Sequence, residues 1–299
     1  MPLAAFPKCY LDHLSVDHTM TVDEWVELAS RLDVDGLEFY WGFTPNDDPE
    51  ELDRIRELVE EKGLTIPMMC YSPDFTKPEP EARDAEVEEQ KEAVRATARL
   101  GGSYCRVLSG QRRPNVGLDE GLTWVAQSIH RVLPVAEEED VTLILENHYK
   151  DGYWEYPEFA QKQDVFLELL DRLGEHEHLG VNYDPSNAII AGDDPIELLH
   201  AVKDRVVTMH ASDRYFSDGD LEDLQAIDAD AHTGYADILE HGVIGEGLND
   251  YDEIFSILRE AGFDGWVSIE DGEDPENGMD ELSESARFLR EKMAAHGLE

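Results

Sequence analysis

The stretch TLILE, residues 142–146, is an apolar run that ends in a carboxylate, Glu146. A short apolar run with β-branched residues predicts a buried strand, and a buried strand has no structural need for a charged side chain at its end. Three later apolar runs end in a similar way, at Asp184, His210 and Glu270. We therefore expect four ligand-type side chains, each placed where a strand leaves a sheet.

Short apolar runs alternate with helical patterns on both sides of this stretch, which predicts repeated strand and helix units around a parallel sheet. The helical patterns carry apolar residues at 3.6-residue spacing, for example after the capping box formed by Thr21 and Glu24. Eight strands are expected, at residues 8–13, 36–40, 65–71, 104–108, 142–146, 179–183, 206–210 and 265–269.

The positions of the polar residues favour a closed barrel over an open sheet. Candidate functional side chains end strands two, four, five, six, seven and eight, whereas an open sheet gathers them at one switch point. No Gly-rich phosphate-binding fingerprint follows the first expected strand. Because one α/β barrel commonly runs to about 250 residues or more, we predict a single (β/α)8 TIM barrel domain over residues 1–299.

Two connections are longer than a compact barrel needs. Residues 148–163 are rich in aromatic side chains and are expected to wall a substrate pocket. Residues 211–249 separate the seventh strand from the next helix and are long enough to hold helical turns of their own. We expect this second segment to form a lid or an oligomer contact.

The charge of the chain is strongly negative, with 69 Asp and Glu against 24 Lys and Arg, a net charge of −45 and a pI near 4.3. Such a surface repels phosphates, so neither nucleic acid nor an anionic membrane is expected as a partner. Acidic helix faces with little lysine are typical of proteins that stay soluble in concentrated salt, and we predict a halophilic, cytoplasmic protein. We expect no membrane span and no signal peptide, because the required apolar runs are missing.

The four strand-end residues predict a metal site. Three carboxylates that converge on a barrel mouth repel one another unless a cation lies among them. Carboxylate oxygens with one imidazole and no thiolate suit Mn²⁺, Mg²⁺ or Co²⁺, and Zn²⁺ also accepts such ligands. We therefore expect one divalent metal ion, bound by Glu146, Asp184, His210 and Glu270.

With these residues and three further motifs, the chain resembles the xylose isomerase-like TIM barrel superfamily, which includes sugar phosphate isomerases and epimerases, ketose 3-epimerases, inosose dehydratases and endonuclease IV. The motifs are His210-x-x-Asp213, the segment VIGEG at residues 243–247 and the segment GFDGWVSIE at residues 262–270. The resemblance covers nearly the whole chain. It implies the same four metal ligands, and it implies that Glu146 and Glu270 form an acid/base pair that moves a proton through a metal-stabilised enediolate.

Further residues are expected near the substrate. Arg214 follows the His-x-x-Asp motif where family members place an arginine toward substrate oxygens, and Asp213 is expected to orient His210. Asn187 stands where relatives often have a substrate-binding histidine. The remaining candidates for substrate contact are His148, Glu38, Arg106 and His241.

The resemblance leaves several activities open. A sugar isomerase or epimerase is the main reading, with a sugar, polyol or keto acid as the substrate and association into a homo-oligomer as an option. An inosose or dehydroshikimate dehydratase begins with the same proton abstraction but then expels a hydroxyl group. An endonuclease IV-like nuclease is disfavoured, because Asn187 replaces a histidine, Leu239 stands where an Asp-x-His element is needed, and the charge is −45. A noncatalytic barrel is the last alternative.

Overall fold

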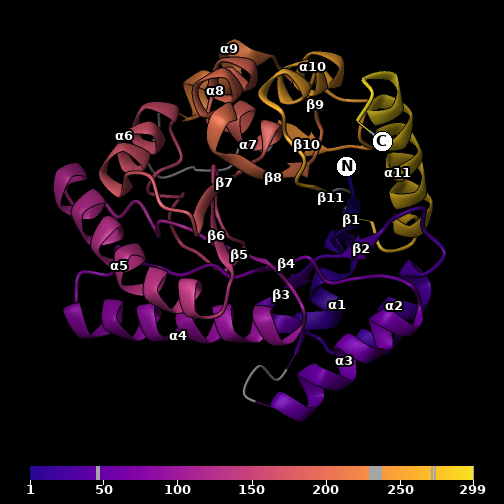
Figure 1. Cartoon of the computed structure of the whole chain (residues 1–299). Helices are drawn as coiled ribbons and strands as arrows, with labels where there is room; N and C mark the ends of the chain where they lie inside the picture. The colour runs from indigo at the N-terminus through magenta and orange to yellow at the C-terminus, as the bar shows by residue number, and fades with distance from the viewer. Residues whose placement is uncertain (45–47, 229–237, 271, 273, 299) are drawn as a thin grey trace.

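The computed structural model describes residues 1–44, 48–228, 238–270, 272 and 274–298 of the chain, and a ring of parallel strands lies at its centre (Figure 1). Along the sheet the strand order is β2-β1-β11-β8-β7-β6-β5-β4-β3. The strands are β1 (Leu3–Ala5), β2 (Gly36–Leu37), β3 (Phe39–Tyr40), β4 (Met68–Cys70), β5 (Tyr104–Val107), β6 (Thr142–Glu146), β7 (Leu179–Tyr183), β8 (Val206–Ala211) and β11 (Trp266–Ile269).

The two ends of this sheet meet at Glu38, so the sheet closes into a barrel. Glu38 separates β2 from β3, which together fill the one strand position expected at residues 36–40. Its backbone N–H donates to the carbonyl oxygen of Ala5 at 3.0 Å, and the N–H of Leu37 donates to that of Thr65 at 2.8 Å. Eight strand positions with helices outside them confirm the predicted α/β barrel.

The expected first strand, at residues 8–13, is wrong. The barrel strand is β1, whose three residues are fully buried, and residues 8–13 instead form the 3-10 helix η1 (Lys8–Tyr10) and the start of α1 (Leu11–Ser15). Pro7 precedes η1 and has no N–H for a strand ladder, so pairing stops there. As a result, Lys8 lies just past the end of a strand rather than inside one.

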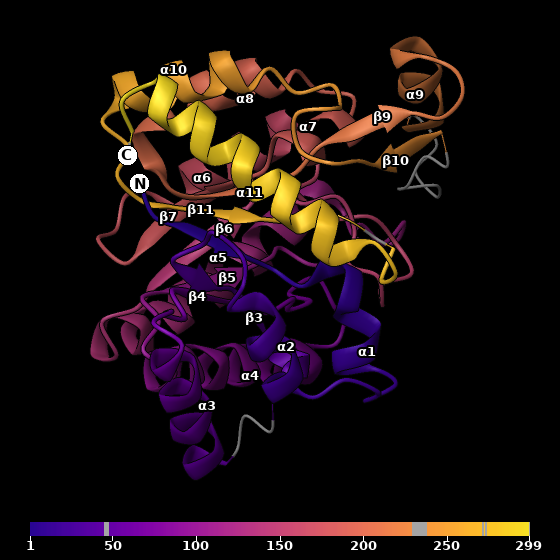
Figure 2. The ribbon, with the colours of Figure 1, turned by 90° about the vertical axis from the view of Figure 1, so that its right-hand side faces the viewer.

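An outer ring of helices covers the barrel (Figures 1 and 2). The longer ones are α2 (Val22–Ala29), α3 (Pro49–Glu61), α4 (Pro80–Arg99), α5 (Leu118–Glu138), α6 (Gln163–Leu173), α8 (Pro195–Val202), α10 (Tyr251–Ala261) and α11 (Gly278–Ala295). Short turns are η2 (Trp41–Phe43), α7 (Pro185–Ile190) and η3 (Lys203–Arg205).

Local signals in the sequence explain the helix ends. The capping box at α2 forms, with the N–H of Glu24 donating to Thr21 Oγ1 at 3.2 Å and the N–H of Thr21 donating to Glu24 Oε2 at 2.8 Å. Gly262 ends α10 in the left-handed conformation, with φ of 76°, which a glycine adopts without steric cost. The helices turn apolar residues such as Trp25 and Ile254 toward the sheet, where both are fully buried.

The long connection at residues 211–249 contains β9 (Arg214–Phe216), α9 (Leu221–Asp228) and β10 (Leu239–His241), while residues 229–237 lie outside the described part. β9 and β10 pair antiparallel and extend beyond one end of the barrel (Figure 2). Leu224 and Leu239 pack against Ile189 and Ile190, so apolar contacts fasten the hairpin onto α7. Within the described chain, no helix has the length and apolar character needed to cross a membrane.

Candidate metal centre and substrate cavity

The four predicted ligands end neighbouring strands of the barrel. Glu146 ends β6, Asp184 and Glu270 directly follow β7 and β11, and His210 lies near the end of β8. Because these parallel strands are adjacent, their carboxyl ends meet at one edge, and one ligand atom from each residue lies within 4.8 Å of the others. Glu146, Asp184 and His210 are buried, whereas the Glu270 side chain is 12% exposed.

The charges of this cluster fit a divalent cation. Burial, together with the nearby charges of Glu270 and Glu146, raises the pKa of Asp184 from 3.8 to about 7. Burial opposes ionisation of Glu146 too, but His210 and Arg106 outweigh it and lower its pKa to about 2. The three carboxylates thus repel one another when all are ionised, and a cation among them would offset that repulsion. Three carboxylates and one imidazole suit Mn²⁺, Mg²⁺, Co²⁺ or Zn²⁺.

Asp184 and Glu146 are held in place by donors from neighbouring segments. Asp184 Oδ1 accepts from Ser212 Oγ at 2.7 Å and from the N–H of Asn187 at 3.0 Å. The Asn187 side chain donates to Glu146 Oε1 at 3.1 Å. Asn147, which the sequence analysis did not single out, ties the Asp184 backbone to β6 through two hydrogen bonds. Asn187, which is predicted to contact the substrate, therefore holds a predicted metal ligand in this structure.

Glu38, and not Asp213, is the partner of His210. The Nδ1 atom of His210 faces Glu146 and Glu270, at 3.2 and 2.9 Å, and its Nε2 atom lies 2.9 Å from Glu38 Oε1. The expectation that Asp213 orients His210 is wrong in this structure. Glu38, which is predicted to contact the substrate, has a fully buried side chain that packs against His210 and Cys70.

Asp213 instead organises the loop after β10. Its carboxylate accepts backbone N–H donors from Gly245 and Gly247, both at 3.0 Å, and from Asn249 at 3.2 Å. A Cβ atom on Gly247 would lie 2.2 Å from Asp213 Oδ1, which explains the glycine at this position. The VIGEG segment thus encodes a turn wrapped around one buried carboxylate.

Replacing Asp213 by Ala should loosen this turn. The variant removes the carboxylate acceptor of three partly buried N–H groups, at about 1–3 kcal/mol each, so amide hydrogen exchange at residues 245–249 should quicken about 5- to 150-fold. Asp250→Ala removes only the cap of α10 and serves as the control. Equal exchange at residues 245–247 in both variants and the wild type would show that Asp213 does not hold the turn.

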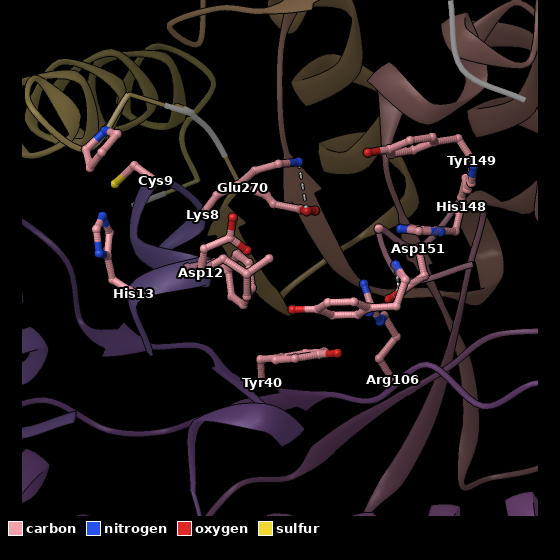
Figure 3. A pocket seen from close by; sticks show the side chains of 16 residues that line it. Lys8, Cys9, Asp12, His13, Tyr40, Arg106, His148, Tyr149, Asp151 and Glu270 are labelled. Atoms are coloured by element: carbon pink, nitrogen blue, oxygen red, sulfur yellow. Dashed lines mark hydrogen bonds and ion pairs between the residues drawn. The ribbon is translucent and has the colours of Figure 1, made fainter. Parts of the chain in front are cut away.

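A cavity of about 550 Å³ opens beside the cluster (Figure 3). Of the predicted site residues, Glu270, Arg106 and His148 line it. Tyr149 and Tyr153 also line it, so the aromatic connection after β6 walls the cavity as expected. The remaining lining residues are Phe6, Lys8, Cys9, Leu11, Asp12, His13, Tyr40, Lys150, Asp151, Gly152 and Pro275.

Lys8 is the most important residue that sequence reasoning missed. Its Nζ atom lies 3.2 Å from Glu270 Oε1, and its side chain is 15% exposed (Figure 3). The error in the first strand concealed it, because a lysine inside a strand gives no reason to expect a place at the mouth. The usable signal was Pro7, which ends the run of buried residues that begins at Leu3.

Arg214 and His241 lie together behind the cavity wall. Arg214 Nη2 is 2.6 Å from His241 Nε2, and the Arg214 guanidinium lies over the ring of Tyr149, 5.2 Å from its centre. Tyr149 in turn lines the cavity. Arg214 therefore reaches the cavity through Tyr149, His241 contacts Arg214, and neither is among the residues that line the cavity.

Metal binding should release protons in a pH-dependent way. In the metal-free protein, burial lowers the pKa of His210, but Glu38, Glu146 and Glu270 outweigh it and raise that pKa well above its usual value. When the metal binds, His210 should therefore release a proton to the buffer at both pH 6 and pH 8. Asp184, with its pKa near 7, should lose one only at the lower pH.

Calorimetric Mn²⁺ titrations in two buffers of different ionisation enthalpy should thus show about one proton fewer released at pH 8 than at pH 6. The raised pKa also means that Asp184 contributes stability to the metal-free protein below about pH 4, which is lost as the pH rises through about 7. Asp184→Asn is the control, and its release should not change between the two values. A pH-independent release in the wild type would contradict the charge assignment.

Comparisons with known proteins agree with this architecture. The model of the xylose isomerase-like TIM barrel family matches residues 26–292. Inosose dehydratase from Bacillus thuringiensis (strain Al Hakam) is 23% identical over 176 residues, which are 56% of this chain and 53% of that relative. The match thus spans about half the length of the curated relative.

Two solved structures share the fold over nearly the whole chain. A D-tagatose 3-epimerase-like protein has a TM-score of 0.77 at 19% identity and covers 99% of this chain and 98% of its own. The IolI protein with a bound zinc atom has a TM-score of 0.74 at 16% identity and covers 99% of both chains. At this identity the two structures establish the fold alone. With the family model matched over most of its length, the chain belongs to the xylose isomerase-like TIM barrel family.

Proposed function

We propose that the chain is a divalent-metal-dependent enzyme that removes a proton next to a carbonyl group of a sugar-like substrate, in the manner of a sugar isomerase or epimerase. The observation that carries this proposal is the position of Glu270. Among the described residues, it is the one member of the ligand cluster that also lines the cavity. When bound, the metal ion would act as a Lewis acid and stabilise negative charge on substrate oxygens.

The two glutamates have unequal surroundings, which supports different roles. Glu146 Oε2 accepts from Arg106 Nη1 at 2.9 Å, and Glu146 Oε1 accepts from Asn187, so donors already hold both oxygens. Glu270 turns Oε2 toward His210 and Oε1 toward Lys8 at the cavity. We infer that Glu270 takes the substrate proton, while Glu146 serves first as a ligand that Arg106 keeps ionised.

An epimerase also needs a group that returns the proton from the other face of the substrate. In the expected acid/base pair this group is Glu146, which would have to give up one of its two donors before it accepts a proton. His148 also lines the cavity, but burial lowers its pKa to about 4 and keeps its imidazole neutral. A neutral imidazole can accept a proton at neutral pH but has no acidic proton to return, so His148 could act as a base and not as the acid.

A dehydratase is the second candidate, and the bonding of Glu146 favours it. A lyase of this kind needs one base and one acid for the departing hydroxyl group, so it does not require Glu146 to accept a proton. The 23% identity to inosose dehydratase over about half of each chain supports the same reading. Lys8 borders the cavity and is the candidate for protonating the leaving oxygen.

NMR analysis of the products formed in D₂O distinguishes an isomerase or epimerase from a dehydratase. The protein, loaded with Mn²⁺ or Co²⁺ and then freed of excess metal, is incubated with ketoses and with a cyclitol ketone, and the products are followed by NMR. Deuterium on carbon in an isomer or epimer supports the first reading, and loss of the β-hydroxyl with a new enone supports the second. Metal-loaded protein that produces neither result with any of these compounds would contradict the proposed function.

A further inference from the structure

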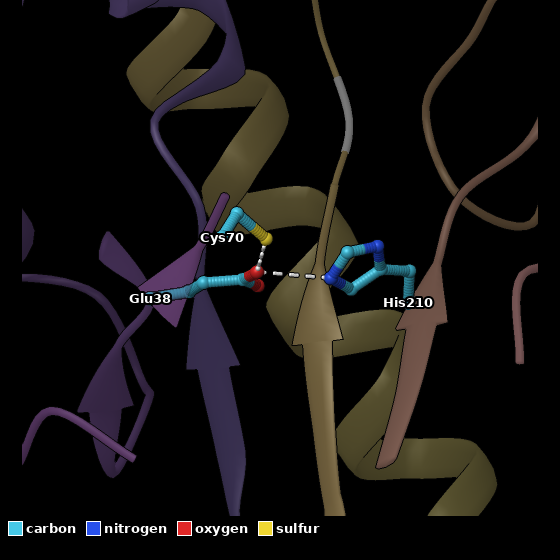
Figure 4. A group of neighbouring side chains, drawn as sticks. All are labelled: Glu38, Cys70 and His210. Atoms are coloured by element: carbon cyan, nitrogen blue, oxygen red, sulfur yellow. Dashed lines mark hydrogen bonds and ion pairs between the residues drawn. The ribbon is translucent and has the colours of Figure 1, made fainter. Parts of the chain in front are cut away.

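Two buried side chains support His210 on the side away from the other ligands (Figure 4). Glu38 Oε1 lies 2.9 Å from His210 Nε2, and the Cys70 thiol lies 2.6 Å from the same oxygen. All three residues are buried, and they come from three positions of the barrel: Glu38 between β2 and β3, Cys70 from β4 and His210 from β8. The group therefore reaches across the barrel interior.

We propose that Glu38 is a positioning residue that fixes the ring of His210 with Nδ1 toward the metal, and that Cys70 in turn fixes Glu38. This inference rests on the proposed metal-dependent function. A neutral imidazole carries one proton, and a carboxylate acceptor at Nε2 draws the proton to that nitrogen. The lone pair of Nδ1 then points to Glu146 and Glu270, from which it lies 3.2 and 2.9 Å.

Two hydrogen bonds fix the position of Glu38, so its carboxylate can restrain the orientation of the His210 ring. Its backbone N–H is bonded to Ala5 where the two ends of the sheet meet, and the Cys70 thiol donates to its carboxylate. Outer carboxylates of this kind fix both the tautomer and the orientation of a ligating histidine, and their loss commonly weakens metal binding about 10- to 100-fold. The same loss is expected here.

The same three residues could instead hold a metal of their own, because a thiolate, a carboxylate and an imidazole form a soft ligand set. Such a site would use the Cys70 thiolate as a ligand, whereas the Cys70 thiol donates to Glu38 Oε1 in this structure. The supporting role is therefore favoured, and the experiment below distinguishes the two arrangements.

The test measures Co²⁺ affinity, by competition with a chelator, for the wild type, Glu38→Met, Cys70→Ser and Cys70→Ala. We expect the affinity to fall about 10- to 100-fold in Glu38→Met and to stay close to the wild type in Cys70→Ser, whose hydroxyl can still donate. Cys70→Ala should lie between them. Glu86→Met is the matched control, because Glu86 accepts from Tyr71 and from the Asp74 backbone but touches no ligand.

Three results would count against the proposal in different ways. A wild type that takes up no Co²⁺ would overturn the metal centre and with it the proposed function. A wild type that binds Co²⁺ with the same affinity as a folded Glu38→Met variant would overturn only the role of Glu38. An intense thiolate-to-cobalt absorption band that disappears in Cys70→Ser would show that Cys70 is a ligand.

A second variant covers the case in which Glu38→Met does not fold. Glu38→Gln keeps the shape of the side chain but offers a weaker, neutral acceptor to His210. In Zn²⁺-loaded protein with ¹⁵N-labelled histidine, the Nε2 proton of His210 should resonate far downfield in the wild type and move upfield in Glu38→Gln. An unchanged resonance would mean that Glu38 does not hold this proton.

Discussion

Glu270→Gln is expected to slow proton removal from the substrate by about 10²- to 10⁴-fold, which is the usual contribution of a positioned acid or base. The amide keeps the size of the side chain but cannot accept the proton. Glu270 is the predicted ligand that borders the cavity, so its loss should affect the chemical step more than substrate binding. The measurement is the rate at which deuterium from D₂O enters the substrate.

Metal content must be measured in the same samples, because an amide is a weaker metal ligand than a carboxylate. Glu276→Gln changes the charge by the same amount at an exposed position in the connection between β11 and α11, and it should leave the exchange rate unchanged. A metal-loaded Glu270→Gln protein that retains more than about a tenth of the wild-type rate would assign the proton transfer to another group.

Arg106→Met is expected to destabilise the metal-free protein by about 3–5 kcal/mol, because it leaves a buried carboxylate without its cationic partner. The side chains of Arg106 and Glu146 are 6% and 0% exposed, and Nη1 of Arg106 lies 2.9 Å from Glu146 Oε2. Arg106 also donates to Ser72 Oγ at 2.9 Å. Saturating Mn²⁺ should reduce the loss, since a cation would then neutralise Glu146.

Urea unfolding with and without Mn²⁺ measures both effects. The control is Arg95→Met, which removes an exposed ion pair to Glu92 on α4 and should cost no more than about 0.5 kcal/mol. If Arg106→Met lost no more stability than this control, Glu146 would not depend on Arg106 for its charge. If Arg106→Met lowered the free energy of unfolding equally with and without metal, Arg106 would stabilise the protein through contacts other than that with Glu146.

The strands that carry the ligands could be read from the sequence because their apolar runs are long and end abruptly. The expected strands at residues 142–146 and 179–183 coincide with β6 and β7 at both ends. β1 was missed because three small or apolar residues near the start of the chain give too short a signal. The position of Lys8 was therefore predicted wrongly too, because a residue lies at the mouth of the barrel only when it follows the end of its strand.

The partners of the site residues were harder to predict than their positions. Alternation along a strand shows that Glu38 faces the opposite side from Leu37 and Phe39, but not whether it meets a substrate or a histidine across the barrel. Asp213 follows His210 closely in sequence, yet the turn at residues 245–249 surrounds its carboxylate. The partners of Glu38 and Asp213 depend on the depth of the barrel and on the path of a loop. Local sequence patterns do not predict either of these.

The predicted ligands have some of their supports in a distant part of the chain. All four predicted ligands lie between residues 146 and 270, as do Asn147, Asn187 and Ser212. The other supporting side chains, Lys8, Glu38, Cys70 and Arg106, belong to the first 106 residues. Arg106 meets Glu146 across the neighbouring strands β5 and β6, but Lys8 and Glu38 reach Glu270 and His210 only when β1 pairs with β11 and the barrel closes. If closure is a late step of folding, metal binding will hardly change the folding rate. It will instead slow unfolding, because the ion stabilises contacts that form only in the closed barrel.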